Sequence, residues 1–328
     1  MPQPELFVTL WPSFPHFDRF SRDSRIAGIR LNSAMISNPE LEKELVLVKD
    51  SKTEIPMYFD AKARQLRVEE VHENPDYLDI SLNHPISVQT PCIVLFKQEI
   101  DQAMLAEVTE GGRRLKFSLN PRYNVRPGES LHIRHSSLQV HGPNFTDIEK
   151  EKIRRVREFG FRRYFLSYVE NQSIIDEFLE MVGSDAEVFL KIENERGLEF
   201  VASEFQKRDG LYLVAARGDL YVELDRPHKI LQALKLIISK DPEACVGSRI
   251  LLSIIGDPVP SCADFLELAW LYDIGYRKMM LCDEICLREE WLGTAINAFD
   301  SFRNSYPEDQ ITLDLRDETE ISPIESIA

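Results

Sequence analysis

The chain has 328 residues, of which 43% are hydrophobic, so it can bury a large core in one or two domains. Its formal net charge of −16 argues against nucleic acid and anionic membrane as main partners, because both require basic surface. The N-terminal residues, MPQPE, lack the pattern of a signal peptide, and no apolar run reaches the roughly 20 residues of a membrane helix. Together with five widely spaced cysteines, these features predict a cytoplasmic protein with reduced thiols.

Short apolar runs alternate with helical patterns along most of the chain, and eight of these runs are typical of strands. They are near-continuously hydrophobic, as expected for parallel strands that are buried on both faces. In chain order they cover residues 6–10, 27–31, 56–60, 163–167, 188–192, 211–216, 249–254 and 278–281. Helices are expected over 174–182 and 230–238, and Thr146 begins a capping-box pattern. Eight such repeats predict an α/β fold, the (β/α)8 TIM barrel.

One interval, residues 68–140, breaks this rhythm. It has no long helical pattern and instead shows short strand-like runs at 78–82, 92–96, 105–108, 115–119 and 131–135. We interpret it as a small β-domain inserted after strand 3, and a long elaborated loop is the alternative. The barrel then comprises residues 1–67 and 141–305, and the acidic tail 306–328 is expected to be disordered.

Candidate functional residues follow the predicted strands, because active sites of (β/α)8 barrels lie at the carboxyl ends of the strands. Glu193 and Asp219 come after neighbouring runs and offer the hard oxygen ligands that Mg²⁺ or Mn²⁺ prefers. Lys191 points to the same side of its strand as Glu193 and can stabilise negative charge on an enolate or a phosphoryl group. Gly218 allows close backbone approach to a ligand.

Two arginines, Arg30 and Arg67, can hold a carboxylate or a phosphate through forked hydrogen bonds. Plainer readings exist for several candidates: a single Lys-x-Glu is commonly a solvated strand end, and Asp60 can be a helix cap. The convergence of these groups on one rim favours an active site that stabilises an enolate or a transferring phosphoryl group.

Two segments carry a family resemblance. Residues 191–197 read KIENERG and resemble the pyruvate kinase motif Lys-Ile-Glu-Asn-x-Glu-Gly. Residues 214–220 read VAARGDL and resemble Met-Val-Ala-Arg-Gly-Asp-Leu. Weaker similarities follow in the family's order at 9–13, 30–33, 60–67, 167–169, 260–264 and 280–284.

This resemblance implies phosphoryl transfer between phosphoenolpyruvate and ADP, giving pyruvate and ATP, as in glycolysis. It implies Mg²⁺ on Glu193 and Asp219, and contact of Lys191 with the transferring phosphoryl group. The remaining implied roles are substrate phosphate binding by Arg30, Arg67 and Ser167, K⁺ binding by Asn32 and Asp60, and proton delivery near Ser253. The family also implies a homo-oligomer and identifies the inserted β-domain as a lid.

The chain departs from the family's pattern mainly in its nucleotide contacts. Ala34 stands where a nucleotide-binding histidine is expected, and the lid lysine expected around residues 135–138 is missing. Ala61 removes a hydroxyl from the K⁺ site, and Gln65 and Cys262 replace charged residues. Because the sequence ends just after the barrel, the family's C-terminal regulatory domain is expected to be absent.

These departures leave two alternatives to the kinase reaction. One is a metal-dependent lyase or aldolase that holds a pyruvate enolate on the same barrel, which the loss of nucleotide contacts favours. The other is a non-catalytic relative, which the loss of Lys191, Glu193 or Asp219 would have indicated. All three residues are present.

Overall fold

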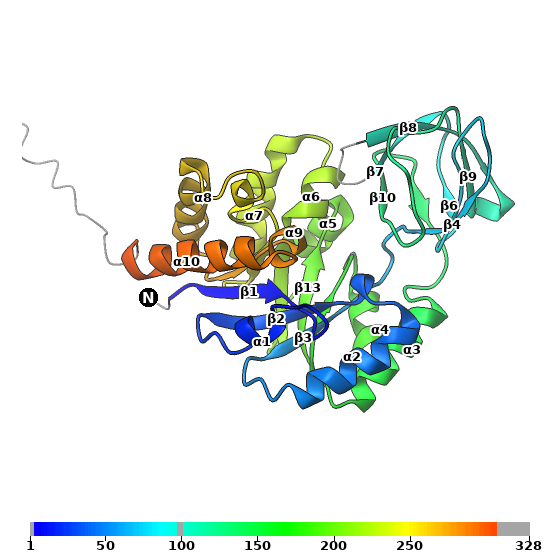
Figure 1. The fold of residues 1–328 in the computed structure, drawn as a ribbon. Coiled ribbons are helices and arrows are strands. Elements are labelled where there is room, and N and C mark those ends of the chain that lie inside the picture. The colour runs from blue at the N-terminus through cyan, green and yellow to red at the C-terminus, as the bar shows by residue number, and fades with distance from the viewer. Residues whose placement is uncertain (1–2, 97–100, 307–328) are drawn as a thin grey trace, which may run out of the picture.

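The computed structural model describes residues 3–96 and 101–306, and its centre is a closed barrel of eight parallel strands (Figure 1). The order around the barrel is β1-β16-β15-β14-β13-β12-β3-β2. The strands are β1 (Glu5–Thr9), β2 (Ile26–Asn32), β3 (Met57–Ala61), β12 (Arg163–Leu166), β13 (Glu187–Ile192), β14 (Leu211–Ala216), β15 (Cys245–Gly247) and β16 (Lys278–Met280). The prediction of a (β/α)8 barrel is therefore confirmed.

Helices connect the strands and surround the barrel (Figure 1). They are α1 (Phe17–Phe20), α2 (Asn38–Asp50), α3 (Asp147–Glu158), α4 (Gln172–Val182), α5 (Glu195–Ser203), α6 (Arg217–Glu223), α7 (Ile230–Lys240), α8 (Cys262–Asp273), α9 (Asp283–Cys286) and α10 (Glu289–Ser305). The predicted cap is present, because the Thr146 hydroxyl accepts a hydrogen bond from the Glu149 amide at the start of α3. Within the described ranges, no helix combines the length and apolarity needed to cross a membrane.

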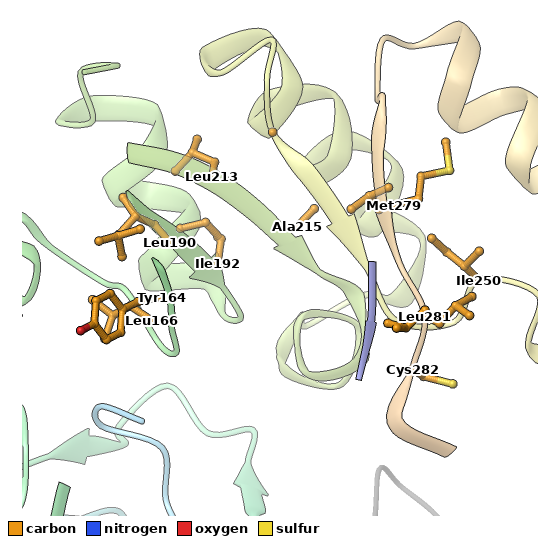
Figure 2. Packing of buried hydrophobic residues seen from close by; sticks show 14 of the residues in the cluster. Tyr164, Leu166, Leu190, Ile192, Leu213, Ala215, Ile250, Met279, Leu281 and Cys282 are labelled. Carbon is orange, nitrogen blue, oxygen red and sulfur yellow. The ribbon is translucent and has the colours of Figure 1, made fainter. Parts of the chain in front are cut away.

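The main core lies between the strands and the helices. In β13, Leu190 and Ile192 point outward into this core while Lys191 points inward, because successive strand side chains alternate in direction. Figure 2 shows these two residues in the same cluster as Leu213 and Ala215 of the neighbouring strand β14. This alternation places the apolar half of each strand against the helices and leaves the other half for the barrel interior.

A second, smaller core fills the barrel interior with aromatic rings. The Phe165 and Phe189 ring centroids lie 5.0 Å apart, and those of Tyr58 and Phe189 lie 5.4 Å apart. Gly28 makes room for this packing, because a Cβ there would lie 2.5 Å from the Phe7 ring. The barrel is thus closed by side chains, and a layer of polar groups lies above the rings.

The interval after β3 forms a separate antiparallel sheet beside the barrel (Figure 1). Its strand order is β10-β7-β8-β9-β5-β4, and a second ribbon pairs β11 with β6. The strands are β4 (Val68–His72), β5 (Asp79–Leu82), β6 (Ile86–Ser87), β7 (Cys92–Phe96), β8 (Asp101–Thr109), β9 (Arg114–Phe117), β10 (Leu131–Ile133) and β11 (Gln139–Val140). A hydrophobic core of its own supports an inserted β-domain rather than an elaborated loop. The boundaries at 67/68 and 140/141 stay a prediction, and the tail 307–328 lies outside the described residues.

The prediction for the seventh barrel strand is wrong. The strand is β15, only three residues long, and residues 249–254 instead form a turn that leads into the 3-10 helix η4 (Leu252–Ile255). Arg249 and Leu251 have left-handed backbone, with φ of 60° and 54°. The apolar run reflects burial of Ile250 and Ile254, and this spacing is helical rather than extended. The correction moves Ser253 away from the end of a strand.

Candidate functional site

The candidate site begins as a polar layer directly above the aromatic rings of the barrel. Side chains two residues apart on a strand point the same way, so each inward residue of the lower layer has a partner one step nearer the carboxyl end. The lower layer is Phe7, Gly28, Tyr58, Phe165 and Phe189, and the layer above it is Thr9, Arg30, Asp60, Ser167 and Lys191. The sequence pattern that builds the barrel therefore also brings these five polar side chains together.

Asp60 is the centre of this polar layer and is fully buried. Arg30 donates to its Oδ2 atom from Nε at 2.7 Å, Lys62 donates at 3.0 Å, and Lys191 Nζ lies 3.5 Å away. The Ser167 hydroxyl donates to the other oxygen at 3.1 Å. Burial alone would raise the pKa of Asp60, but the three cations outweigh burial and hold that pKa well below its ordinary value.

Lys191 links this layer to Glu193. Its ammonium group lies 3.0 Å from the Ser167 hydroxyl and 3.0 Å from Glu193 Oε1. Burial acts to lower the pKa of Lys191, but Asp60 and Glu193 reverse the effect and raise it. Lys62 has no second close carboxylate among the residues that the structure describes, and burial lowers its pKa to about 8. Lys191 is therefore the firmly charged amine of the site.

Glu193, which is buried, and Asp219, which is partly exposed, form a pair of carboxyl groups near the start of α6. The Tyr168 amide donates to Glu193 Oε2 at 2.6 Å and fixes its orientation. Burial, together with the charge of Asp219, raises the pKa of Glu193 to about 7 despite the opposing effect of Lys191. Burial also acts to raise the pKa of Asp219, but His132 and Lys191 lower it overall. Two carboxylates that resist joint ionisation are suited to a shared divalent cation.

The carboxyl groups of Glu193 and Asp219 are the part of the site that could bind a divalent cation. Among residues 3–96 and 101–306, no group of three His, Cys, Asp or Glu side chains encloses a metal position. Two carboxylates facing a cavity nevertheless fit Mg²⁺, which commonly takes one or two protein carboxylates and fills its other positions with water and substrate oxygens. Glu193 and Asp219 both line such a cavity, so the donor set fits a divalent cation.

This cavity has a volume of about 550 Å³, within the range of small-molecule sites. It brings together six of the residues predicted from the sequence, namely Arg30, Lys191, Glu193, Gly218, Asp219 and Ser253. It also contains Ser248, Arg249 and Asp283, which the sequence reasoning did not select. Most of the predicted site residues therefore line the same cavity.

Two predicted residues, Arg67 and Ser167, do not line the cavity, and a third, Ser253, lines it with its hydroxyl already hydrogen bonded. Arg67 lies outside the cavity, at the junction with the inserted domain, where it donates to the Gly128 carbonyl at 2.6 Å and to the Gln65 side chain. Ser167 is buried between Asp60 and Lys191, so its hydroxyl is already engaged. Ser253 lines the cavity, but its hydroxyl donates to Asp264 and accepts from the Ser261 amide.

Ser248 occupies the place that the sequence analysis gave to Ser253. It directly follows β15, and a Cβ on Gly218 would lie 3.3 Å from its hydroxyl oxygen. It was missed because the longer apolar run that follows this short strand was taken as the strand. Lys62 and Asp283 were also missed, although Lys62 directly follows β3 and Asp283 lies three residues after β16.

Asn32 and Asp60, predicted to hold a monovalent cation, are neighbours in register on β2 and β3. Their polar atoms are already engaged. The Asn32 amide group donates to Asp283 at 2.8 Å, its oxygen accepts from the Ala34 amide, and Asp60 accepts from three cations. This arrangement does not fit a K⁺ site.

The inserted domain contacts the site through β10. His132 is buried, and its Nδ1 lies 2.6 Å from Glu223 while its Nε2 lies 3.5 Å from Asp219. Burial alone would lower the pKa of His132, but the hydrogen bond to Glu223 and the charge of Asp219 raise it. Arg134 donates to the Val222 carbonyl nearby. The inserted domain thus lies docked on α6, which also carries Asp219.

No family model matches the chain, but individual proteins do. The chain is 23% identical over 305 residues to a pyruvate kinase of Thermoplasma acidophilum, covering 85% of this chain and 54% of the relative. It is 25% identical over 244 residues to a pyruvate kinase of Dictyostelium discoideum, covering 66% and 48%. A pyruvate kinase of Agaricus bisporus is 23% identical over 305 residues, covering 80% and 56%. The chain spans about half the length of the curated relatives it matches.

Proposed function

We propose that this pyruvate kinase-like chain is a divalent-metal-dependent phosphotransferase that acts between phosphoenolpyruvate and ADP. The observation that carries the proposal is the single cavity in which Lys191 and Arg30 face the carboxyl pair Glu193 and Asp219. Phosphoryl transfer requires such an arrangement of cations and metal-binding carboxyl groups in one cavity, because its catalysis depends mainly on positioning and charge stabilisation.

Glu193 and Asp219 would hold Mg²⁺ or Mn²⁺. When bound, the ion would neutralise charge on phosphoryl and enolate oxygens. The raised pKa of Glu193 supports this role, because a divalent cation replaces the shared proton that two neighbouring carboxyl groups otherwise need. The Tyr168 amide keeps Glu193 in place for that purpose.

Lys191 would neutralise the transferring phosphoryl group, and Arg30 would bind its oxygens. Lys191 keeps its charge because Asp60 and Glu193 raise its pKa. Arg30 is held by Asp60 on one side and by Asp283 at 2.8 Å on the other, so its guanidinium is oriented before substrate arrives. Preorganisation of both cations lowers the cost of charge rearrangement in the transition state.

Loss of the phosphoryl group leaves enolpyruvate, whose methylene carbon must take up a proton to give pyruvate. We assign this region to the Ser248 hydroxyl at the end of β15 rather than to Ser253. Ser253 is tied to Asp264 and holds the turn that follows. The docked β10 would restrict water at this stage, since His132 and Arg134 attach the inserted domain to α6.

A lyase or aldolase acting on a pyruvate enolate remains the second candidate. The supporting observation is that Ala34, an exposed residue, replaces the nucleotide-binding histidine that the family resemblance leads one to expect. The same carboxyl pair and lysine would stabilise an enolate without any nucleotide.

The test is a coupled assay of the purified chain with phosphoenolpyruvate, ADP and Mg²⁺. Lys191→Met is expected to lower kcat by about a hundredfold to a thousandfold, the usual loss when one preorganised charge-stabilising group is removed. Lys235→Met, at an exposed lysine of α7, serves as the matched control and should leave kcat unchanged. Absence of pyruvate formation by the wild-type chain, with condensation of pyruvate and an aldehyde instead, would establish the second candidate.

A further inference from the structure

Arg249 differs from the other two cations that line the cavity. Arg30 is paired with Asp60 and Asp283, and Lys191 is paired with Glu193 and Asp60. Arg249 makes no ion pair within the part of the chain that the structure describes, and its Nε is buried without a hydrogen-bond partner. A guanidinium that is partly removed from water and has no hydrogen-bond acceptor there is expected to bind an anion.

The chain holds Arg249 in this position by unusual backbone geometry. Ser248 and Arg249 both adopt left-handed conformations, with φ of 66° and 60°. Such conformations are costly for residues with side chains and are concentrated at ligand sites. Arg217 fixes the turn by donating to the Ser248 carbonyl from Nε at 3.1 Å and from Nη2 at 2.5 Å.

An aromatic ring fixes the guanidinium itself. The Arg249 group stacks over Tyr221 of α6, with its central carbon 4.5 Å from the ring centroid. Stacking occupies one face of the planar group and leaves its N–H edge available for an acceptor. The side chain is therefore preorganised beside the cavity rather than extended into bulk water.

We propose that Arg249 forms a second anion subsite of the cavity, and that it binds a distal carboxylate of an oxyacid whose keto or enol oxygen lies at the metal held by Glu193 and Asp219. The substrate class would then be a dicarboxylic α-keto or enol acid. This inference rests on the proposed function, which places the enolate oxygen at that metal. It goes beyond that function by naming the larger acid that the site prefers.

Two features favour a carboxylate over a phosphate at this subsite. A single guanidinium edge matches one carboxylate in forked geometry, whereas phosphate dianions are usually held by several donors. The cavity wall also includes the acidic side chains Asp283 and Glu284, which would repel a doubly charged group more strongly. A volume of about 550 Å³ leaves room for the longer acid.

The test is calorimetric titration of the whole chain, with Mg²⁺ present, by three acids. α-Ketoglutarate and α-ketovalerate share one carbon skeleton and differ in the distal carboxylate, and pyruvate probes the first subsite alone. Wild-type protein should bind α-ketoglutarate about tenfold to a hundredfold more tightly than α-ketovalerate, as expected for a hydrogen-bonded charge pair. Arg249→Gln should remove this preference and leave pyruvate binding unchanged.

Two further variants serve as controls. Arg249→Lys keeps the charge without the fork and should retain part of the preference. Arg208→Gln, at an exposed arginine before β14, should retain all of it. Mg²⁺-dependent pyruvate binding without any preference for α-ketoglutarate, or a preference that survives Arg249→Gln, refutes the subsite alone. Failure of all three acids to bind overturns the proposed function as well.

Discussion

Replacing the buried carboxylate Asp60 tests how the charges of the polar layer stabilise one another. Its side chain is fully buried and lies within 3.5 Å of the charged groups of Arg30, Lys62 and Lys191. Asp60→Asn preserves the shape of the side chain but removes its charge. The three cations then remain in a buried layer without the carboxylate on which they converge.

The expected cost follows from that burial. Removing one member of a buried ion pair commonly destabilises a protein by about 3–5 kcal/mol, because the partner charge stays desolvated and unpaired. We expect a loss in this range, a large fraction of the typical stability of a domain. Urea denaturation at neutral pH would measure it as a lower midpoint with an unchanged dependence on urea.

The pH dependence has a definite sign. Because the folded-state pKa of Asp60 lies below its unfolded value of about 3.9, its contribution is fully present above that pH. The contribution is lost as the pH falls toward the folded pKa, so wild type and Asp60→Asn should converge in acid.

A matched control uses Asp225, whose carboxylate pairs with Lys229 at 2.7 Å with both side chains about half exposed. Asp225→Asn should lower the free energy of unfolding far less than Asp60→Asn, because solvent screens exposed pairs. Equal losses for Asp225→Asn and Asp60→Asn would refute the reasoning that burial of the charge sets the magnitude.

Two other predictions concern the inserted domain. His132→Gln should weaken docking of β10 on α6, because glutamine cannot contact Glu223 and Asp219 at once, and faster amide exchange in β10 with unchanged exchange in β5 would show it. Asp79 accepts hydrogen bonds from Nε and Nη2 of Arg114, at 2.8 and 3.0 Å, and these hydrogen bonds lower the pKa of Asp79. Asp79→Asn should therefore cost about 1–2 kcal/mol at neutral pH, and the difference from wild type should fall as pH drops below about 3.9; a constant difference in acid denaturation would contradict this.

The barrel could be predicted from the sequence because its strands are short, hydrophobic and regularly spaced. Seven of the eight expected strands overlap the observed ones, and the inserted β-domain was recognised by its different rhythm. β15 was not recognised, because the longer apolar run that directly follows this short strand has the stronger hydrophobic pattern and packs at helical spacing. The assignment of Ser253 to that strand failed for the same reason.

Residues of the candidate site could be predicted from the sequence where they lie on a barrel strand or directly after it. Lys191 and Glu193 follow from the alternation of β13, and Arg30 and Asp60 follow from that of β2 and β3. Arg67 shows the limit of this logic. It follows β3 in the chain but turns toward the Gly128 carbonyl of the inserted domain, a partner that lies 61 residues away in sequence.

By itself, the sequence determined the barrel, the inserted domain and the identity of the carboxyl pair with its lysine, because each depends on local hydrophobic period and on strand direction. Only the tertiary structure decided which polar groups already have partners. Asn32 and Ser167 look available in the sequence but are hydrogen bonded in the fold, whereas the Arg249 Nε has no acceptor among the residues that the structure describes. Pairing of buried charges depends on contacts between distant segments, and no local pattern records it.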